Sequence, residues 1–409
     1  MSDTRKAIGL REALKMTLAH AHPLSAVRVP LLEGLNRVMA ADVRARVDSP
    51  SVDASLMDGY AVRASDISSA TNDRPVALEL SGTATAGSSP GLVVESQKTL
   101  RVMTGAPIPS GADAVVPEEF TTRQGDLILF DRCAEPGSNI LPKGSDVSMG
   151  RVVARAGCLT TPGRIGMLAA AGYSDLEVIQ APEIALVATG DEVMLPGKPL
   201  ADGKLYASNI ITMGGWCKHY GFETRLCVVG DRLEKICQTL EQTIHEVDVI
   251  ISSGGAWAGD KDLMIQALEH LGWKEVFRRI TMTPGKGVGF GLLHHKPVFM
   301  LPGRPSANAM GFLQIALPGL LRLAGYGHTG LPEMDVQLAQ ELTGRHMEWT
   351  QFVFGSLERQ SSRPIFHPLL NRSRLQAVAM AEAIVAIPEG ESHLPAGTVV
   401  KAQHLGCKL

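Results

Sequence analysis

Residues 183–192 read EIALVATGDE and residues 247–255 read VDVIISSGG, and these two stretches decide the fold class. Each is a short apolar run followed at once by polar residues and glycine. That pattern is typical of a buried strand that ends in a ligand-binding turn. Strand and helix patterns then alternate along the chain as far as residue 328. The order predicts an α/β domain over residues 182–328, with a parallel sheet that helices cover on both faces.

The segment before residue 51 has a helical pattern. Leu10, Leu14 and Leu18 fall on one face of a helix, and Pro30 opens a second amphipathic run. Both runs are therefore predicted to be helices.

Two further segments have strand patterns. Residues 51–146 alternate apolar and polar side chains and are interrupted by glycine and proline, which predicts a small β-rich domain. Residues 329–409 return to short strands and predict a β-barrel or a sandwich. Between them, the helix that starts near residue 305 is predicted to bend or end near Pro318.

Length and composition exclude several classes of protein. A chain of 409 residues is long enough for about two to four domains. With 45% hydrophobic and 20% charged residues it has the composition of a globular protein. The net charge of -3, without a basic run, argues against nucleic acid as the main partner. No apolar stretch is long enough to span a membrane, and the N-terminus lacks the apolar core of a signal peptide, so we expect a cytoplasmic protein.

Polar clusters follow the strands of the α/β segment at their carboxyl ends. They are residues 189–192, 230–231, 252–255 and 301–305. In an open parallel sheet these ends share one edge, where glycine lets backbone N–H groups approach a phosphate. Any single one of these glycines is also explained by an ordinary turn between strand and helix. The convergence of four turns on one edge favours a ligand site.

Carboxylates crowd the same edge. They are Asp191, Glu192, Asp231, Asp260 and Asp262. Oxygen ligands of this kind suit Mg²⁺ held together with a substrate phosphate. The alternative is that Asp260 or Asp262 caps the N-terminus of the following helix.

One cation stands on a glycine loop beside these turns. Lys286 lies in the sequence Thr283-Pro284-Gly285-Lys286-Gly287 and is placed to neutralise a bound anion. The alternative is a solvated surface lysine.

Several motifs together resemble the MoeA family of molybdopterin molybdenumtransferases, to which the E domain of gephyrin is related. The matching segments are SLMDGYAVR at 55–63, MTGAP at 103–107, GADAVV at 111–116, the glycine and aspartate of 144–146, TGDE at 189–192, Tyr206 with Asn209, and SSGG at 252–255. The resemblance covers nearly the whole chain.

The resemblance implies a division into four parts. Residues 1–50 and 147–181 would form an elongated helical domain, and residues 51–146 a β-rich domain inserted into it. Residues 182–328 would form the α/β molybdopterin-binding domain, and residues 329–409 a C-terminal β-barrel. The family also implies a homodimer whose active cleft is shared between subunits, and a MogA-like adenylyltransferase as a possible partner.

The function implied by the resemblance is molybdenum cofactor biosynthesis. Adenylylated molybdopterin would be hydrolysed with Mg²⁺, and molybdate would be inserted into the dithiolene. The implied catalytic residues are Asp58, Thr104, Asp191, Glu192, Asp262 and Lys286, with Asp191, Glu192 and Asp262 on the metal. The implied pterin- and phosphate-binding residues are Asn209, Asp231, Ser252, Ser253, Gly254, Gly255, Pro302, Gly303, Arg304 and Arg374. Asp58 and Thr104 would reach the cleft from the inserted domain of the partner.

The sequence departs from the family pattern at the oxyanion end of the site. Thr283 stands where the family has the first lysine of K-P-G-K-P. Arg304 replaces the asparagine of LPGNP, and Ala377 stands in place of a serine near Arg374. These changes favour a divergent paralogue. The alternatives are an enzyme that binds or hydrolyses a pterin or nucleotide phosphate without metal transfer, and a dimeric scaffold of the gephyrin kind.

Overall fold

The computed structural model describes residues 7–87, 91–254, 262–370 and 372–406, which form two compact units. One unit comprises residues 1–27, 36–38 and 178–409, and the other comprises residues 28–35 and 39–177. Each unit is described separately below. No helix among the described residues is long and apolar enough to cross a membrane.

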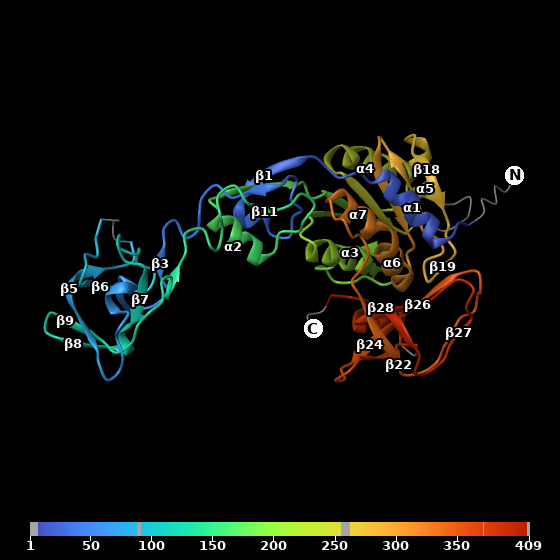
Figure 1. Ribbon diagram of the computed structural model, residues 1–409. Coiled ribbons are helices and arrows are strands. Elements are labelled where there is room, and N and C mark those ends of the chain that lie inside the picture. The colour runs from blue at the N-terminus through green and yellow to red at the C-terminus, as the bar shows by residue number, and fades with distance from the viewer. Residues whose placement is uncertain (1–6, 88–90, 255–261, 371, 407–409) are drawn as a thin grey trace. The chain divides into compact units, whose positions relative to one another are not determined.

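The first unit is built on a six-stranded sheet (Figure 1). Its strand order is β16 (Thr224–Val229), β13 (Ile184–Thr189), β17 (Val249–Ser253), β21 (Lys296–Leu301), β20 (Gly289–Leu293) and β18 (Lys274–Arg278). The first four strands are parallel, which confirms the predicted α/β sheet. β20 pairs antiparallel with β21 through a tight hairpin at His294 and His295, and β18 pairs antiparallel with β20, so β18 runs in the same direction as the first four strands.

Helices cover both faces of this sheet, as its apolar strands require. One face packs against α1 (Leu10–His20), α3 (Ser208–His219), α6 (Pro305–Gly311) and α7 (Leu317–Leu323), and the other against α4 (Leu233–Glu246) and α5 (Leu263–His270). Successive residues of β13 alternate between the two cores, with Leu186 on one face and Val187 on the other. Near β13, β14 (Val193–Met194) and β15 (Leu205–Tyr206) form a separate parallel pair.

The helix that starts at Pro305 does not end at Pro318. A π-helical stretch at Phe312–Ala316 joins α6 to α7, and Pro318 lies in the first turn of α7. Proline lacks the N–H that would close the regular helical hydrogen bond, and a local π-type turn accommodates that loss without stopping the helix.

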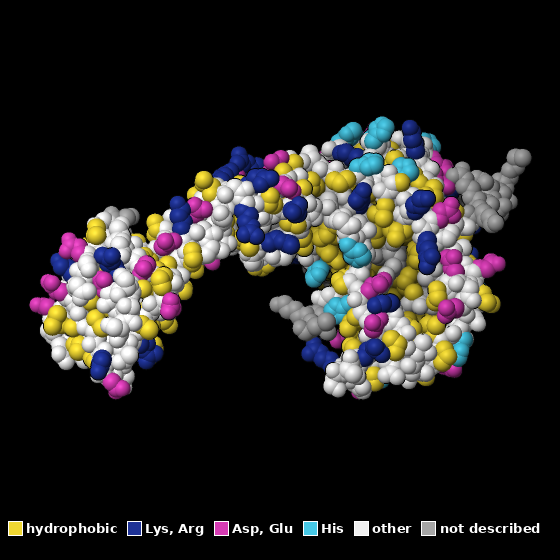
Figure 2. Space-filling view, viewed as in Figure 1, with side chains coloured by type: hydrophobic (Ala, Val, Ile, Leu, Met, Phe, Trp, Pro, Cys, Tyr) yellow, Lys and Arg dark blue, Asp and Glu magenta, His cyan; other side chains and the backbone are white. Residues whose placement is uncertain are grey.

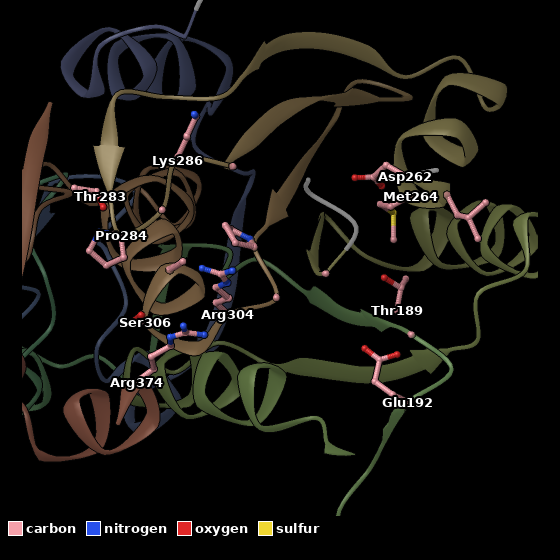
Figure 3. A pocket seen from close by; sticks show the side chains of 18 of the residues that line it. Thr189, Glu192, Asp262, Met264, Thr283, Pro284, Lys286, Arg304, Ser306 and Arg374 are labelled. Carbon is pink, nitrogen blue, oxygen red and sulfur yellow. The ribbon is translucent and has the colours of Figure 1, made fainter. Parts of the chain in front are cut away.

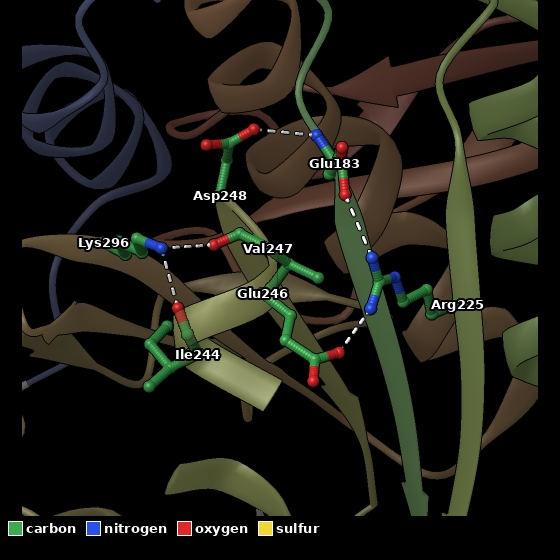
Figure 4. A network of polar contacts seen from close by, with 7 residues as sticks. All are labelled: Glu183, Arg225, Ile244, Glu246, Val247, Asp248 and Lys296. Atoms are coloured by element: carbon green, nitrogen blue, oxygen red, sulfur yellow. Dashed lines mark hydrogen bonds and ion pairs between the residues drawn. The ribbon is translucent and has the colours of Figure 1, made fainter. Parts of the chain in front are cut away.

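The edge of the sheet at the amino ends of the strands is fixed by charge (Figure 4). Arg225 forms ion pairs with Glu183 and Glu246, so it links β16, the start of β13 and the end of α4. The Lys296 ammonium donates to two backbone carbonyl groups at the end of α4, each at 2.7 Å. A cation at a helix C-terminus is favoured by the helix dipole. These polar groups stabilise the edge of the sheet opposite the glycine-containing turns, which follow the carboxyl ends of the strands.

The C-terminal part of this unit is a closed barrel. Its ring contains β24 (Thr350–Glu358), β25 (Ile365–Pro368), β22 (Glu333–Leu338), β28 (Val399–His404) and β26 (Ala383–Ile387), and β26 pairs back with β24. The predicted barrel is confirmed. The short strand β19 (Met282–Thr283) adds to β24 from the α/β segment, α8 (Arg374–Met380) lies beside the barrel, and β23 (Leu342–Thr343) pairs with β27 (His393–Leu394).

The second unit contains the predicted β-rich segment. Its six-stranded sheet has the order β7 (Ala114–Pro117), β4 (Gly59–Val62), β6 (Lys98–Val102), β5 (Val76–Ala84), β9 (Leu127–Phe130) and β8 (Thr121–Gln124). Smaller pairs join β3 (Ala54–Ser55) to β10 (Ile140–Leu141) and β2 (Val43–Arg44) to β11 (Val152–Ala154). The helix α2 (Pro162–Ala170) starts at Thr161, whose hydroxyl accepts from Arg164 N.

The N-terminal segment differs from its prediction in one respect. The first helix, α1, is confirmed, but the run after Pro30 is not an amphipathic helix. The chain forms β1 (Ala26–Pro30), which pairs with β12 (Asp175–Ile179), and then a single 3₁₀ turn over Leu31–Gly34. Pairing between residues far apart in sequence overrode the local helical pattern here. The four-part division and its boundaries stay a prediction.

Candidate active site

A cavity of about 1060 Å³ opens in the first unit at the carboxyl ends of β13, β17 and β21 (Figure 3). This is the edge at which the polar clusters of the sequence were expected to meet. Of the predicted site residues, the cavity is lined by Glu192, Asp231, Gly254, Asp262, Lys286, Pro302, Gly303, Arg304 and Arg374. The sheet edge, the lysine loop and α8 therefore bring together residues that span almost two hundred positions of sequence.

The floor of the cavity depends on close approach of the strand ends. Gly254 follows β17 with a φ of +100°, and a Cβ there would lie 3.1 Å from the carbonyl oxygen of Thr189. A Cβ on Gly303 would lie 3.7 Å from the Cα of Gly254. A side chain at position 254 would be strained by the positive φ and crowded by the neighbouring strand. Glycine here keeps backbone, not side chains, facing the cavity.

The two serines of β17 do not line the cavity. Ser253 Oγ accepts hydrogen bonds from Asn209 Nδ2 at 3.0 Å and from Asn308 Nδ2 at 3.2 Å. Asn209 also donates to Gly303 O and Asn308 to Pro302 O, at 2.8 and 3.0 Å. This amide network ties the turn after β21 to the end of β17. Asn308, 1% exposed, was missed in the sequence, although it is a polar residue in an otherwise apolar stretch of α6.

Ser252 has a different environment. It is fully buried, and its Oγ has no hydrogen-bond partner in the described part of the chain. It alternates with Ser253 and therefore points to the other face of the sheet. Gly255, also predicted in the site, lies outside the described residues, as does Asp260.

Three carboxylates line one end of the cavity, namely Glu192, Asp231 and Asp262. Asp191 is placed differently, because its Oδ1 accepts from Asp231 N at 3.1 Å and so joins two neighbouring turns. Asp262 is the N-cap of α5, with Oδ1 accepting from Ile265 N at 3.3 Å. The capping alternative is therefore correct for Asp262.

The donor chemistry at this end suits a divalent cation, since carboxylate oxygens are the preferred ligands of Mg²⁺. Within the described ranges, however, no three His, Cys, Asp or Glu side chains form a ready-made metal cluster. The metal assignment of Asp191, Glu192 and Asp262 stays a prediction.

The opposite end of the cavity carries cations. Lys286, Arg304 and Arg374 are exposed residues that line it, and Figure 3 shows them apart from Glu192 and Asp262. Thr283 and Ser306 add hydroxyl groups there. The cavity thus has an acidic end and a basic end, which suits a ligand that carries a metal-bound phosphate at one end and an oxyanion at the other.

Trp349 also lines the cavity, although no sequence motif pointed to it. It stands just before β24 of the barrel, 63 positions after Lys286 in the chain. The Lys286 ammonium lies 5.3 Å from the centre of its ring. The pairing of β19 with β24 brings these segments together.

Asp58 and Thr104 lie in the second unit and contact each other. The backbone N–H and the hydroxyl of Thr104 donate to Asp58 Oδ1 at 2.7 and 2.8 Å. These two bonds hold the pKa of Asp58 below its ordinary value. The MDG and MTG segments therefore lie side by side, while their role in a cleft stays a prediction.

Comparison with known proteins identifies the family. Residues 8–172 match the family "MoeA N-terminal region (domain I and II)", and residues 185–322 match the "Probable molybdopterin binding domain". The chain is 31% identical over 385 residues to molybdopterin molybdenumtransferase 2 of Mycobacterium tuberculosis, covering 93% of this chain and 95% of that protein. The chain belongs to the MoeA family.

Other MoeA relatives agree with this assignment. Molybdopterin molybdenumtransferase of Staphylococcus aureus is 29% identical over 401 residues, which cover 97% of this chain and 96% of that protein. The crystal structure of the MoeA protein of Pyrococcus horikoshii superposes with a TM-score of 0.82 at 28% identity, covering 98% of this chain and all of that one. The MoeA fold is thus shared along nearly the whole chain.

Proposed function

We propose that this protein is a molybdopterin molybdenumtransferase of molybdenum cofactor biosynthesis. It would cleave the phosphoanhydride of adenylylated molybdopterin with water and direct molybdenum from molybdate to the dithiolene. The observation that carries this proposal is the charge separation in the cavity. Carboxylates stand at one end and Lys286, Arg304 and Arg374 at the other, at the ligand edge of the sheet.

The residues have separate tasks in this proposal. Glu192 and Asp262, with Asp191 beside them, would hold Mg²⁺, which when bound polarises the phosphoanhydride. The glycine backbone at Gly254 and Gly303 leaves room for the phosphate. Lys286, Arg304 and Arg374 would bind molybdate, a dianion that needs fixed cations and donors.

The dimer is part of the same proposal. Around Asp58 the inserted domain exposes three large apolar side chains, Leu56 (49%), Met57 (42%) and Met103 (37%). Apolar side chains grouped beside a functional pair favour burial against another surface. We propose that the surface is the cleft of a second copy. A MogA-like adenylyltransferase would supply the adenylylated substrate, and both would act in the cytoplasm.

Asp262→Asn tests the enzyme assignment directly. Asparagine keeps the oxygen that caps α5, so the fold is retained, but it loses the charge that would hold the metal. We expect Mg²⁺-dependent hydrolysis of adenylylated molybdopterin to be abolished while binding of molybdopterin is kept. Asp248→Asn is the matched control, because Asp248 accepts from Glu183 N at the far edge of the sheet and should leave hydrolysis intact. Unchanged hydrolysis in Asp262→Asn would remove the metal role.

A second candidate function is hydrolysis without metal transfer. It is favoured by Thr283, which replaces a family lysine, and by Ala377, which is buried and offers no donor where the family has serine. The two functions differ in their products. A transferase releases AMP and retains molybdenum on the pterin, whereas the alternative releases AMP alone, so molybdenum analysis of the product separates them.

A further inference from the structure

We infer that Trp349 is a positioning residue for the oxyanion end of the cavity, and that it acts by holding the Lys286 ammonium over its ring. The inference rests on the proposed function, because it assumes that this end receives an oxyanion.

The contact between the two residues is a cation–π interaction. Lys286 Nζ lies 5.3 Å from the centre of the Trp349 ring, within the roughly 6 Å at which the ring quadrupole attracts a cation. Lysine has a long, flexible side chain, and an exposed ammonium would otherwise sample many rotamers. The ring restricts Lys286 to the wall of the cavity that both residues line.

The backbone of the lysine loop is attached to the same part of the barrel. In the parallel pair of β19 and β24, Met282 is in register with Thr350 and Thr283 with Gln351. Thr350 N also donates to Thr281 O at 3.1 Å. The strand that fixes the start of the lysine loop therefore begins at the residue after Trp349.

The loop that carries Trp349 is itself fixed by a buried amide. Gln351 is 6% exposed, and its Oε1 accepts from Arg345 N at 2.6 Å while its Nε2 donates to His346 O at 3.0 Å. The His346 ring lies 5.0 Å from the Trp349 ring. The tryptophan thus stands on a supported turn.

This arrangement gains importance from the departure at position 283. In a loop with two lysines, one ammonium can still contact the oxyanion when the other adopts a different rotamer. Here Lys286 is the only lysine between Thr283 and Gly287. Its placement then depends on Trp349.

The first measurement needs no ligand. Reductive methylation with ¹³C-formaldehyde gives each lysine a methyl resonance, and Lys286→Arg assigns the one from Lys286. We expect that resonance to be shifted upfield by the ring current of Trp349, and the shift to disappear in Trp349→Leu and persist in Trp349→Phe. A resonance at the position of solvent-exposed lysines in the wild type would overturn the pairing.

The second measurement is calorimetric titration of the unmodified full-length protein with molybdate. Trp349→Leu should weaken binding about two- to five-fold, and Trp349→Phe should restore most of it. In a double-mutant cycle with Lys286→Met, the loss from Trp349→Leu should vanish when the ammonium is absent. A purely structural role of the tryptophan would give the same loss in both backgrounds.

The outcomes separate the two proposals. If the ring shift is present and wild type binds molybdate, but Trp349→Leu binds equally well, the positioning role is wrong and the proposed function stands. If wild type does not bind molybdate at all, the proposed function fails, and the role of Trp349 at an oxyanion site fails with it.

Discussion

Thr283 lines the cavity at its basic end, at the position where the MoeA pattern has a lysine. A hydroxyl there can offer molybdate a neutral hydrogen bond, whereas an ammonium would offer a charge-assisted one. A charge-assisted hydrogen bond contributes about 1.5–3 kcal/mol to binding, and a neutral one about 1 kcal/mol. We therefore expect Thr283→Lys to bind molybdate about two-fold to thirty-fold more tightly than wild type in calorimetric titration.

The control for this change is Thr122→Lys, which adds the same charge on the exposed strand β8 of the other unit. It should leave the affinity unchanged. Equal affinity of wild type and Thr283→Lys would mean that Arg304 already supplies the missing cation, and that the site works as in other family members.

The pair of Asp58 and Thr104 makes a prediction about pH. The N–H and the hydroxyl of Thr104 lower the pKa of Asp58, so the bonded carboxylate stabilises the fold above the ordinary pKa of 3.8. That stability is lost as pH falls through the lowered value. Thr104→Val removes the hydroxyl and keeps the N–H, so the pKa of Asp58 should rise but stay below 3.8.

Titration followed by NMR of the Asp58 carboxyl carbon measures this directly. Asp175 serves as an internal reference, because its pKa is lowered by its bond to Arg28, which the substitution does not touch. An unchanged pKa of Asp58 would show that the backbone N–H alone sets it.

Among single residues of the site, the sequence predicted those that directly follow strands of the α/β sheet and missed those that come from other parts of the fold. Glu192 and Asp262 were found because they stand next to recognisable βα turns. Trp349 was missed because no local pattern links a residue before β24 to a loop 63 positions earlier. Ser253 was expected to face a phosphate, but its hydroxyl bonds to two asparagines, which no spacing rule reveals.

Among the elements, β24 has the widest set of partners, since β25, β26 and β19 all pair with it. The turn that leads into it is supported by Gln351. Replacing this residue by leucine would remove two part-buried hydrogen bonds, to Arg345 N and His346 O, each with a net contribution of about 0.5–1.5 kcal/mol. We expect Gln351→Leu to lower the free energy of unfolding measured in urea by that order.

Gln351→Glu is the matched variant, because it keeps the acceptor for Arg345 N and loses only the donor to His346 O. At neutral pH its buried carboxylate would also face the His346 carbonyl oxygen, so Gln351→Glu should be at least as destabilised as Gln351→Leu, and it should recover at low pH, where the protonated carboxyl can donate. If Gln351→Leu is as stable as wild type, the turn is held by the strand pairing alone.

Elements were predictable where local pattern and tertiary pairing agreed. The amphipathic periodicity of α4 and the apolar runs of β13 and β17 gave the correct type and place. The run after Pro30 failed because its end bonds to β12, about 140 positions later, where Ile179 N donates to Val38 O and Ala40 N donates to Glu177 O. The sequence did not show that β20 runs antiparallel to both of its neighbours, since direction within a sheet follows from the connection and not from composition.

For the whole molecule, the cleft that we propose to be shared between two subunits predicts complementation between inactive variants. In a dimer of Asp58→Asn with Asp262→Asn, one cleft receives an intact Asp262 and an intact Asp58, and the other receives neither. Random mixing of the two variants should restore about one quarter of wild-type hydrolysis, since half of the dimers are mixed and each has one intact site.

Each variant by itself should stay inactive, which is the control. No recovery in a mixture shown by sedimentation to contain mixed dimers would mean that each chain serves its own cleft. A monomer at all concentrations would exclude the shared cleft altogether.

The sequence predicted the organisation of the whole molecule only through the family resemblance. The four-part division depends on which segments pack together, and α1 illustrates the difficulty. Its pattern shows an apolar face but not the partner of that face, which turns out to be α7 and the large sheet. The distribution of charge was easier to predict from the sequence. On the face seen in Figure 2, basic and acidic side chains are interspersed over the α/β and barrel parts, as the small net charge of -3 suggests.

Closure of the barrel has a consequence for aggregation. In its described strands the ring from β24 to β26 returns on itself, so it offers no open edge to a strand of another molecule. The large sheet, in contrast, ends at β16 and β18, whose outer backbone groups can pair with a foreign strand. Arg225 on β16, and Lys274 and Arg278 on β18, place charges along those borders. Such charges disfavour fibrous association, so protein stored at high concentration should owe its resistance to precipitation to these few side chains.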